Sequence, residues 1–220
     1  MRQVAVLCEG QTEEIMVREF LAPELFERDL WLEPVILKTK TAAGGTGRGG
    51  VSRWAKIEKD LRLQLKSTHW AAVTTLLDYY GLPQDSPGMN ADIPNKPARE
   101  RVELIELRIA ERLENHRFIP HLVLHETEAW TFAAAEQLGD LLGEPKLARD
   151  LTRVADTEGG PEEVNNGPET APSKRLLKMY PPYNKTFHGP SSVLDLGLPA
   201  LRDACPHFDA WVGKLISLAE

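Results

Sequence analysis

Cysteine is scarce in this sequence and never falls in a pattern that could build a framework. The 220 residues contain only Cys8 and Cys205, which form no CxxC pair and have no histidine at the spacing of a structural zinc site. Small domains that depend on disulfides carry several cysteines in a short chain. Neither a disulfide scaffold nor a structural zinc site is therefore indicated.

Long apolar runs are missing as well. No stretch approaches the roughly 18 uninterrupted apolar residues that suggest a membrane span. The first residues, Met1-Arg2-Gln3, lead directly into a predicted strand and show no signal-peptide pattern. We therefore expect a cytoplasmic protein without membrane contact.

The sequence also lacks an excess of positive charge. Asp and Glu number 33 against 26 Lys and Arg, which gives a formal net charge of −7. Proteins that bind nucleic acid unaided usually carry a basic face. Contact with DNA or RNA would therefore need a local basic patch, bound metal cations or a partner.

Two common motifs of hydrolases and nucleotide-binding proteins are absent. There is no GxSxG and no Ser-His-Asp arrangement, so hydrolysis by a serine nucleophile is not expected. The glycine-rich stretch GGTGRGG is not followed by the Lys-Ser or Lys-Thr of a P-loop. We expect a mobile loop there, in which Arg48 is a candidate contact for a nucleic-acid backbone.

Predicted strands and helices alternate through the first part of the chain. The predicted strands are short apolar runs without polar alternation, as expected for strands buried on both faces: 4–8, 34–37, 71–77 and 122–124. Helical spacing predicts amphipathic helices over 51–67 and 98–115. This order predicts an α/β fold with a mostly parallel sheet flanked by helices.

The pattern changes after residue 135. Short helical pieces are predicted at 136–142, 145–155, 172–180 and 206–218, with no strong strand. We therefore expect an α/β core over residues 1–135 and a helical, loop-rich C-terminal segment over 136–220 that packs against it.

Acidic residues follow the ends of three predicted strands. Glu9 ends the first and Asp78 the third, and Glu126 and Glu128 follow the fourth. The carboxyl ends of parallel strands meet at one edge, where ligands bind in open sheets. Carboxylate oxygens without clustered Cys or His suit Mg²⁺ or Mn²⁺. The alternative is that these acids cap the following helices, where the helix dipole favours negative charge.

A cluster of cations and polar groups lies in the C-terminal part. In NNGPETAPSKRL, Ser173 is a predicted helix cap, and Lys174 and Arg175 occupy the first turn. Lys185 and His188, in NKTFHGP, could extend this patch. The cluster is a candidate site for a phosphate or carboxylate. Alternatively, Lys174 and Arg175 extend into solvent or pair with a nearby glutamate.

Several motifs together resemble a known group of proteins. CEGQTEE after the first strand and LLDYYG after the third look like a Toprim domain of the kind found in OLD-type nucleases. With LLDYYGLP, LHETEAW, NNGPETAPSKRL and HGP, they resemble an uncharacterised bacterial Toprim-like family that is often encoded beside ABC-type ATPases. The resemblance spans residues 4–211 and implies a Toprim or Rossmann-like fold.

The resemblance also implies roles for individual residues. Glu9 matches the Toprim glutamate, which binds metal or acts in acid–base catalysis, and Glu13 matches the second acid of OLD-type sites. Asp78 matches the first aspartate of an Asp-x-Asp pair, whereas Tyr80 stands in the place of the second. A two-metal site would therefore need Glu126, Glu128 or Asp85 instead.

The expected function is a Mg²⁺- or Mn²⁺-dependent nuclease that hydrolyses phosphodiesters in DNA or RNA, with Glu9, Asp78 and Lys174 as its catalytic residues. It would be the effector of an ATPase-linked bacterial defence system. The expected partners are nucleic acid and an ABC-type ATPase, and a homodimer is a further option. One alternative is a non-catalytic sensor or effector subunit that docks on the ATPase. Another is phosphoryl transfer on a small nucleotide.

Overall fold

The computed structural model describes residues 1–37, 53–90, 96–165, 167 and 169–220. Its centre is a parallel sheet of five strands in the order β2-β1-β3-β4, with β5 also pairing with β3. The strands are β1 (Arg2–Cys8), β2 (Leu30–Ile36), β3 (Ala72–Asp78), β4 (Phe118–Ile119) and β5 (Leu122–Val123). The predicted α/β class with a mostly parallel sheet is thus confirmed.

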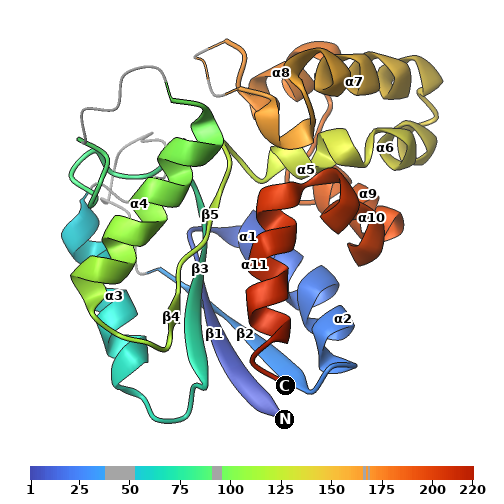
Figure 1. The fold of residues 1–220 in the computed structure, drawn as a ribbon. Helices are drawn as coiled ribbons and strands as arrows, with labels where there is room; N and C mark the ends of the chain where they lie inside the picture. Colours follow the sequence, from blue (N-terminus) through green and yellow to red (C-terminus); the bar gives the residue numbers. More distant parts are fainter. Residues whose placement is uncertain (38–52, 91–95, 166, 168) are drawn as a thin grey trace, which may run out of the picture.

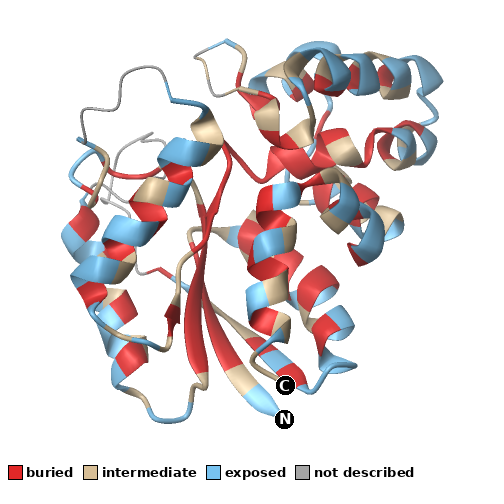
Figure 2. Cartoon of the chain, viewed as in Figure 1, coloured by how far each residue is buried: buried red, intermediate tan, exposed pale blue. Residues whose placement is uncertain are grey.

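Strand β1 shows why the apolar runs are continuous. Val4, Val6 and Cys8 are buried in the core on one face of the sheet, and Ala5 and Leu7 are buried in the core on the other. Successive side chains of a strand point to opposite faces, and here helices cover both (Figure 2). A strand between two helical layers has no solvent face that polar residues could occupy.

One helical layer consists of α3 (Trp54–Lys66) and α4 (Ala98–Leu113), drawn on the left in Figure 1. The other begins with α1 (Gln11–Ile15), a π-helical segment (Met16–Leu21) and α2 (Ala22–Phe26), which follow β1 without interruption. The last helix, α11 (Pro206–Ile216), joins this second layer. The Trp211 indole N–H donates to Thr74 Oγ1 at 2.8 Å and ties α11 to β3.

The remaining helices follow β5. They are α5 (Glu128–Ala133), α6 (Ala135–Leu142), α7 (Pro145–Glu158), the 3-10 turn Pro161–Glu163, α8 (Pro172–Met179), α9 (His188–Leu196) and α10 (Leu198–Ala204). Helices α5 to α8 enclose a small apolar core of their own that includes Phe132, Leu138 and Leu151. This group lies beyond the carboxyl ends of the strands, at the upper right of Figure 1.

The sequence pattern located most of these elements. It missed β4, α9 and α10, and it started β2 four residues late, because Glu33 interrupts the apolar run. The division of the chain after residue 135 remains a prediction. Within the described residues, no helix is both long enough and apolar enough to cross a membrane.

Candidate functional site: the acidic edge

Five carboxylates gather where the strands end, and we call this set the acidic edge: Glu9, Glu13, Asp78, Glu126 and Glu128. The sheet register brings them together. The end of β1 at Cys8 is paired with Leu76, two residues before Asp78, and Asp78 is itself paired with Val123 of β5. The chain then runs through Glu126 into α5, so three neighbouring strands deliver acids to one edge.

The turn after β1 positions Glu13. Gly10 has the extended backbone of a helix N-cap, and its N–H donates to Glu13 Oε2 at 2.9 Å. The Thr127 hydroxyl donates to Glu13 Oε1 at 3.4 Å. Glu13 is therefore a buried acid that closes the start of α1, and it also contacts the loop after β5.

Asp78 is joined to the same loop. The Thr127 N–H donates to Asp78 Oδ1 at 3.0 Å. Thr127 thus links Asp78 and Glu13 through its backbone and its hydroxyl, two acids that lie on separate elements. Within the described residues, the second oxygen of Asp78 accepts no hydrogen bond.

Ser173 holds Glu126 rather than capping its own helix. Helix α8 starts after Ala171 as its N-cap, which corrects the prediction that Ser173 caps it. The Ser173 N–H and hydroxyl donate to the two oxygens of Glu126 at 2.9 and 3.1 Å. The start of α8 therefore receives a carboxylate from within the chain, at the place where the sequence suggested an external anion.

Lys185 contacts the acidic edge directly. Its ammonium lies 2.7 Å from Glu128 Oε1, and the Glu128 side chain is buried whereas that of Lys185 is 45% exposed. Burial would lower the pKa of Lys185, but the charges of Glu128, Glu126 and Asp78 raise it overall. Lys185 is thus a permanent cation at this edge.

Glu9 is the acid with the fewest partners. Its carboxylate lies against Gly81, where an added Cβ would come within 3.1 Å of Glu9 Oε2. Within the described residues its side chain makes no hydrogen bond or ion pair. Glu9 and Asp78 line the same narrow pocket, together with Gly81.

The crowding of acids changes their protonation. The pKa of Glu9 is raised to about 7, first by burial and then by the charge of Glu13. Burial also raises the pKa of Glu128, although Lys185 opposes this. The pKa of Asp78 is raised well above its usual value, first by burial and then by its acidic neighbours: Glu13, Glu128, Glu126 and Glu9. Crowded carboxylates of this kind favour a bound cation.

The donor set fits a hard cation held by few protein ligands. Within the described residues, no three carboxylates of the acidic edge place ligand atoms within 4.8 Å of one another. Glu126 is bound by Ser173 and Glu128 by Lys185, which leaves free oxygens on Glu9 and Asp78. Mg²⁺ is typically held by one or two carboxylates and keeps several waters. Glu9 and Asp78 are therefore the acids of this edge with oxygens left to hold a divalent cation.

His125 lies beside the acids in an unusual backbone conformation. Its φ of 66° is in the left-handed region, which few non-glycine residues adopt. Its Nδ1 is buried and has no hydrogen-bond partner in the described part of the chain. Burial lowers the pKa of His125 to about 4 although Glu126 and Glu158 raise it, so the ring is neutral at neutral pH. Strain of this kind is concentrated at functional sites.

In the described part of the chain, no hydrogen bond or ion pair joins Lys174, Arg175 or His188 to the acidic edge. Arg175 donates to the Thr170 carbonyl at 2.8 Å and pairs with Glu158 at 2.6 Å, so its guanidinium is engaged within the chain. Lys174 is exposed. His188 Nδ1 accepts the Asn184 N–H at 3.0 Å and stabilises a local turn. Arg48 lies outside the described residues.

Asp85 and Tyr80, which follow β3 in the chain, supply no carboxylate to the acidic edge. Asp85, an alternative ligand in the sequence argument, accepts the Trp54 N–H at 2.9 Å and caps the start of α3. Tyr80, which stands where Toprim domains carry an aspartate, has an exposed side chain. Its N–H donates to the His125 carbonyl at 2.9 Å.

The sequence gives no sign that Thr127 binds Asp78 or that Gly81 packs against Glu9. Thr127 lies within the quoted HETEAW motif, but a threonine between two glutamates shows no sign that its N–H binds an acid 49 residues away. Gly81 follows Tyr80 in an apparent turn, and only the structure shows Glu9 against it.

Comparison with known proteins adds one family match and one structural likeness. The sequence profile of a family described as a domain of unknown function (DUF4276) matches residues 8–216. No curated protein matches the chain. Among solved structures, the C-terminal region of the Burkholderia pseudomallei OLD protein is similar, with a TM-score of 0.47 and 15% identity over 100% of both chains. A likeness at this level carries no information about individual residues.

Proposed function

We propose that this chain, which belongs to the family described as domain of unknown function DUF4276, is a metal-dependent phosphodiesterase that cleaves DNA or RNA. One observation carries the proposal. Asp78 lies among four other carboxylates, yet it and Glu9 keep oxygens that no group of the described chain satisfies. Such an arrangement is costly for the protein alone and favourable once a divalent cation binds.

In this proposal Glu9 and Asp78 hold Mg²⁺ or Mn²⁺, and Glu13 adds negative charge from the buried side. The cation supplies charge neutralisation and Lewis acidity toward a phosphoryl oxygen. Thr127 keeps Asp78 and Glu13 in fixed positions, because it donates to both. These contacts preorganise the acids before substrate binds.

Lys185 replaces Lys174 as the proposed phosphate contact. It is anchored on Glu128 at the acidic edge, and its partly exposed ammonium can also meet an incoming phosphate. A lysine binds phosphate as a point charge and needs no fixed orientation. In a chain with a net charge of −7, this cation and the bound metal supply the local positive charge that nucleic acid requires.

A non-catalytic role is the second candidate, and the internal pairing of the acids favours it. Ser173 occupies both oxygens of Glu126, Lys185 pairs with Glu128, and Tyr80 offers no carboxylate. Such an edge would stabilise the fold of a subunit that docks on an ABC-type ATPase. Association with an ATPase, action in bacterial defence and a homodimer rest on the motif resemblance alone and stay proposals.

Nuclease assays on Asp78→Asn and Glu9→Gln test the proposal. Each change keeps the shape of the side chain and removes its charge. Cleavage of plasmid, single-stranded DNA and tRNA with Mn²⁺ should fall by a factor on the order of 10² or more in both variants. Their melting temperatures in EDTA should hold or rise, because one member of a crowded acidic cluster has been neutralised.

Glu24→Gln serves as the matched control, because Glu24 is an exposed glutamate of α2 away from the edge. It should leave both cleavage and metal-induced stabilisation unchanged. If wild-type protein binds Mn²⁺ but cleaves none of the three substrates, the non-catalytic candidate replaces the enzyme. Equal stabilisation by Mn²⁺ in wild type and in both acid variants would reject the metal site itself.

A further inference from the structure

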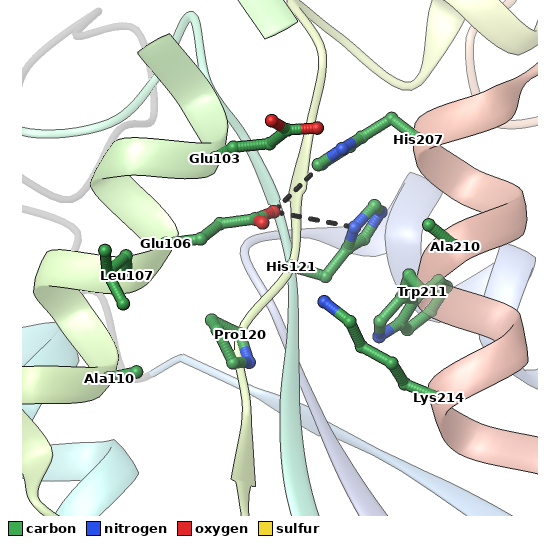
Figure 3. A pocket seen from close by; sticks show the side chains of 10 residues that line it. All are labelled: Glu103, Glu106, Leu107, Ala110, Pro120, His121, His207, Ala210, Trp211 and Lys214. Atoms are coloured by element: carbon green, nitrogen blue, oxygen red, sulfur yellow. Dashed lines mark hydrogen bonds and ion pairs between the residues drawn. The ribbon is translucent and has the colours of Figure 1, made fainter. Parts of the chain in front are cut away.

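A second group of polar side chains lies at the side of the sheet, between α4 and α11. It lines a cavity of about 270 Å³, and we call it the histidine pocket: Glu103, Glu106, His121, His207, Trp211 and Lys214. Figure 3 shows Glu106 reaching from α4 toward His121 on the chain before β5 and His207 at the start of α11.

Three buried side chains of this pocket converge on one point. Glu106 Oε1 lies 2.9 Å from His207 Nε2 and 3.7 Å from His121 Nδ1. Each of the three offers one ligand atom within 4.8 Å of the others, and no other group of three or more His, Cys, Asp or Glu in the described residues does so. His121 Nε2 is buried and finds no hydrogen-bond partner among the described residues.

We propose that Glu106, His121 and His207 bind a divalent transition-metal ion, with Zn²⁺ as the best match. Two imidazoles and one carboxylate form a three-ligand set that zinc uses, with a fourth position left open. This site is separate from the acidic edge and differs from it in chemistry. An ion with nitrogen ligands belongs here, and a hard ion with oxygen ligands belongs at Glu9 and Asp78.

The spacing suits a tetrahedral ion. Zinc bonds to nitrogen and oxygen of roughly 2.0–2.2 Å place neighbouring ligand atoms about 3.3 Å apart. The separations from Glu106 Oε1 to His207 Nε2 and to His121 Nδ1, 2.9 and 3.7 Å, lie on either side of this value, so small side-chain rotations would complete the site. The cavity borders the three ligands and gives room for a water or a small anion as the fourth ligand.

The surroundings hold the ligands in place. The Leu122 N–H donates to Glu106 Oε1 at 2.8 Å, and the ring of His121 stacks on Trp211 with centroids 4.3 Å apart. Glu162 accepts the backbone N–H groups of His207 and Phe208 at 2.8 and 3.0 Å, which fixes the start of α11. Contacts from neighbouring residues to the metal-binding side chains fix the orientation of those side chains for metal binding.

The charges near the pocket partly cancel. Lys214 lies in the pocket and opposes a cation, whereas Glu103 and Glu162 favour one. Glu103 is itself paired with Arg99 at 2.9 Å. Metal would bind through the lone pair of His207 Nε2, so it would compete with the hydrogen bond between this atom and Glu106 Oε1.

A bound ion would connect three parts of the chain that are far apart in sequence. Glu106 belongs to α4 in one helical layer, His121 lies at the edge of the sheet, and His207 belongs to α11 in the other layer. The ion would therefore fix the C-terminal helix against the α/β core, and its removal would loosen α11 first.

Cobalt spectroscopy tests this site because Co²⁺ reports its ligands. In a four-coordinate site with nitrogen ligands Co²⁺ absorbs visible light much more strongly than in a six-coordinate site of oxygens. Wild-type protein stripped with EDTA and titrated with Co²⁺ should show the strong band at one ion per chain, and Zn²⁺ should displace it. Glu106→Gln should weaken Zn²⁺ binding at least about tenfold.

Two further variants separate the sites. Glu103→Gln changes an exposed acid of the same pocket one turn away, and Glu9→Gln changes the acidic edge. Both should keep the strong band. The proposal is overturned if wild type shows only the weak spectrum of an all-oxygen site, or if Glu106→Gln binds Zn²⁺ as tightly as wild type. Since the first outcome needs no variant, a failure of Glu106→Gln to fold leaves the test intact.

Discussion

The acidic edge and the histidine pocket stabilise buried carboxylates in different ways. At the acidic edge the carboxylates are bound by backbone N–H groups, two hydroxyls and one lysine. Glu9 alone has no hydrogen-bond or ion-pair partner in the described chain. In the histidine pocket the buried carboxylate of Glu106 accepts from Leu122 and pairs with His207. The acidic edge therefore has more acidic than basic side chains, whereas in the histidine pocket the acidic and basic side chains nearly balance.

Because of this difference, the two regions should affect the stability of the metal-free protein in opposite directions. Burial, and then the charge of neighbouring acids, raises the pKa of Glu9 and Asp78, so ionisation of these two acids costs free energy in the folded protein. In the histidine pocket, burial would lower the pKa of His207, but its hydrogen bond to Glu106 raises it overall, so the pair supports folding even without metal. Metal removal should therefore affect the two regions unequally, and three experiments can break or sharpen this contrast.

The largest effect is expected for His207→Leu in metal-free protein. The change leaves the buried Glu106 carboxylate without the imidazole that pairs with it, and removing one partner of such a buried pair costs about 3–5 kcal/mol. Urea denaturation in EDTA should show a loss of about 3 kcal/mol in the free energy of unfolding. The double variant Glu106→Gln/His207→Leu should recover a large part of it, because glutamine still accepts the Leu122 N–H without a charge.

His116→Leu is the control for this experiment, because His116 is exposed in the turn after α4. It should change the free energy of unfolding by less than about 0.5 kcal/mol. Equal stability of His207→Leu and His116→Leu would mean that the histidine pocket contributes nothing to folding without metal, and the contrast with the acidic edge would disappear.

A smaller effect is expected for Lys185→Met at the acidic edge. Glu128 would lose its partner while only 4% of its side chain is exposed, but the 45% exposure of Lys185 screens the pair. We therefore expect a loss of about 1–2 kcal/mol, less than for a fully buried pair. Adding Glu128→Gln should restore most of it, whereas Lys178→Met, an exposed lysine of α8, should change nothing.

The outcome for Lys185 also bears on the surplus charge. If Lys185→Met is as stable as wild type, then Glu128 takes up a proton at little cost and the acidic edge tolerates one more unpaired acid than its geometry indicates. The measurement is the same urea titration in EDTA, repeated with Mn²⁺ to show whether a bound cation replaces the lost lysine.

The sequence could predict the acidic edge because its members follow local rules. Glu9 and Asp78 each end a continuous apolar run, and a parallel sheet brings such strand ends together. The partners of these acids were not predictable in the same way. Ser173 lies 47 residues from Glu126, and nothing near either residue in the chain specifies that contact.

The histidine pocket was invisible in the sequence for the same reason. Glu106, His121 and His207 are separated by up to 101 residues, and each lies among apolar residues of its own element. Its geometry depends on how α11 docks on the sheet, and that docking depends on side-chain packing such as the bond from Trp211 to Thr74. Patterns within one element predict that element, but they do not specify the packing between distant ones.

The smallest effect is the dependence of the Glu9→Gln variant on pH. Glu9 has a pKa of about 7 in the folded protein against 4.5 for an ordinary glutamate, so between these values the folded chain binds more protons at this position than the unfolded chain. The free energy of unfolding of wild type therefore falls as the pH rises through this window. Glutamine has no charge to acquire, so this contribution is absent from the variant.

In EDTA, Glu9→Gln should match wild type near pH 4.5 and exceed its stability above pH 7. One pKa unit corresponds to about 1.4 kcal/mol, and since water screens the partly exposed Glu9, we expect a difference of about 1 kcal/mol. Glu24→Gln should give a curve parallel to wild type, because Glu24 is exposed. A Glu9→Gln curve that is also parallel to wild type would show that the acidic edge is not crowded in solution, and the electrostatic reason for a cation at Glu9 and Asp78 would fall.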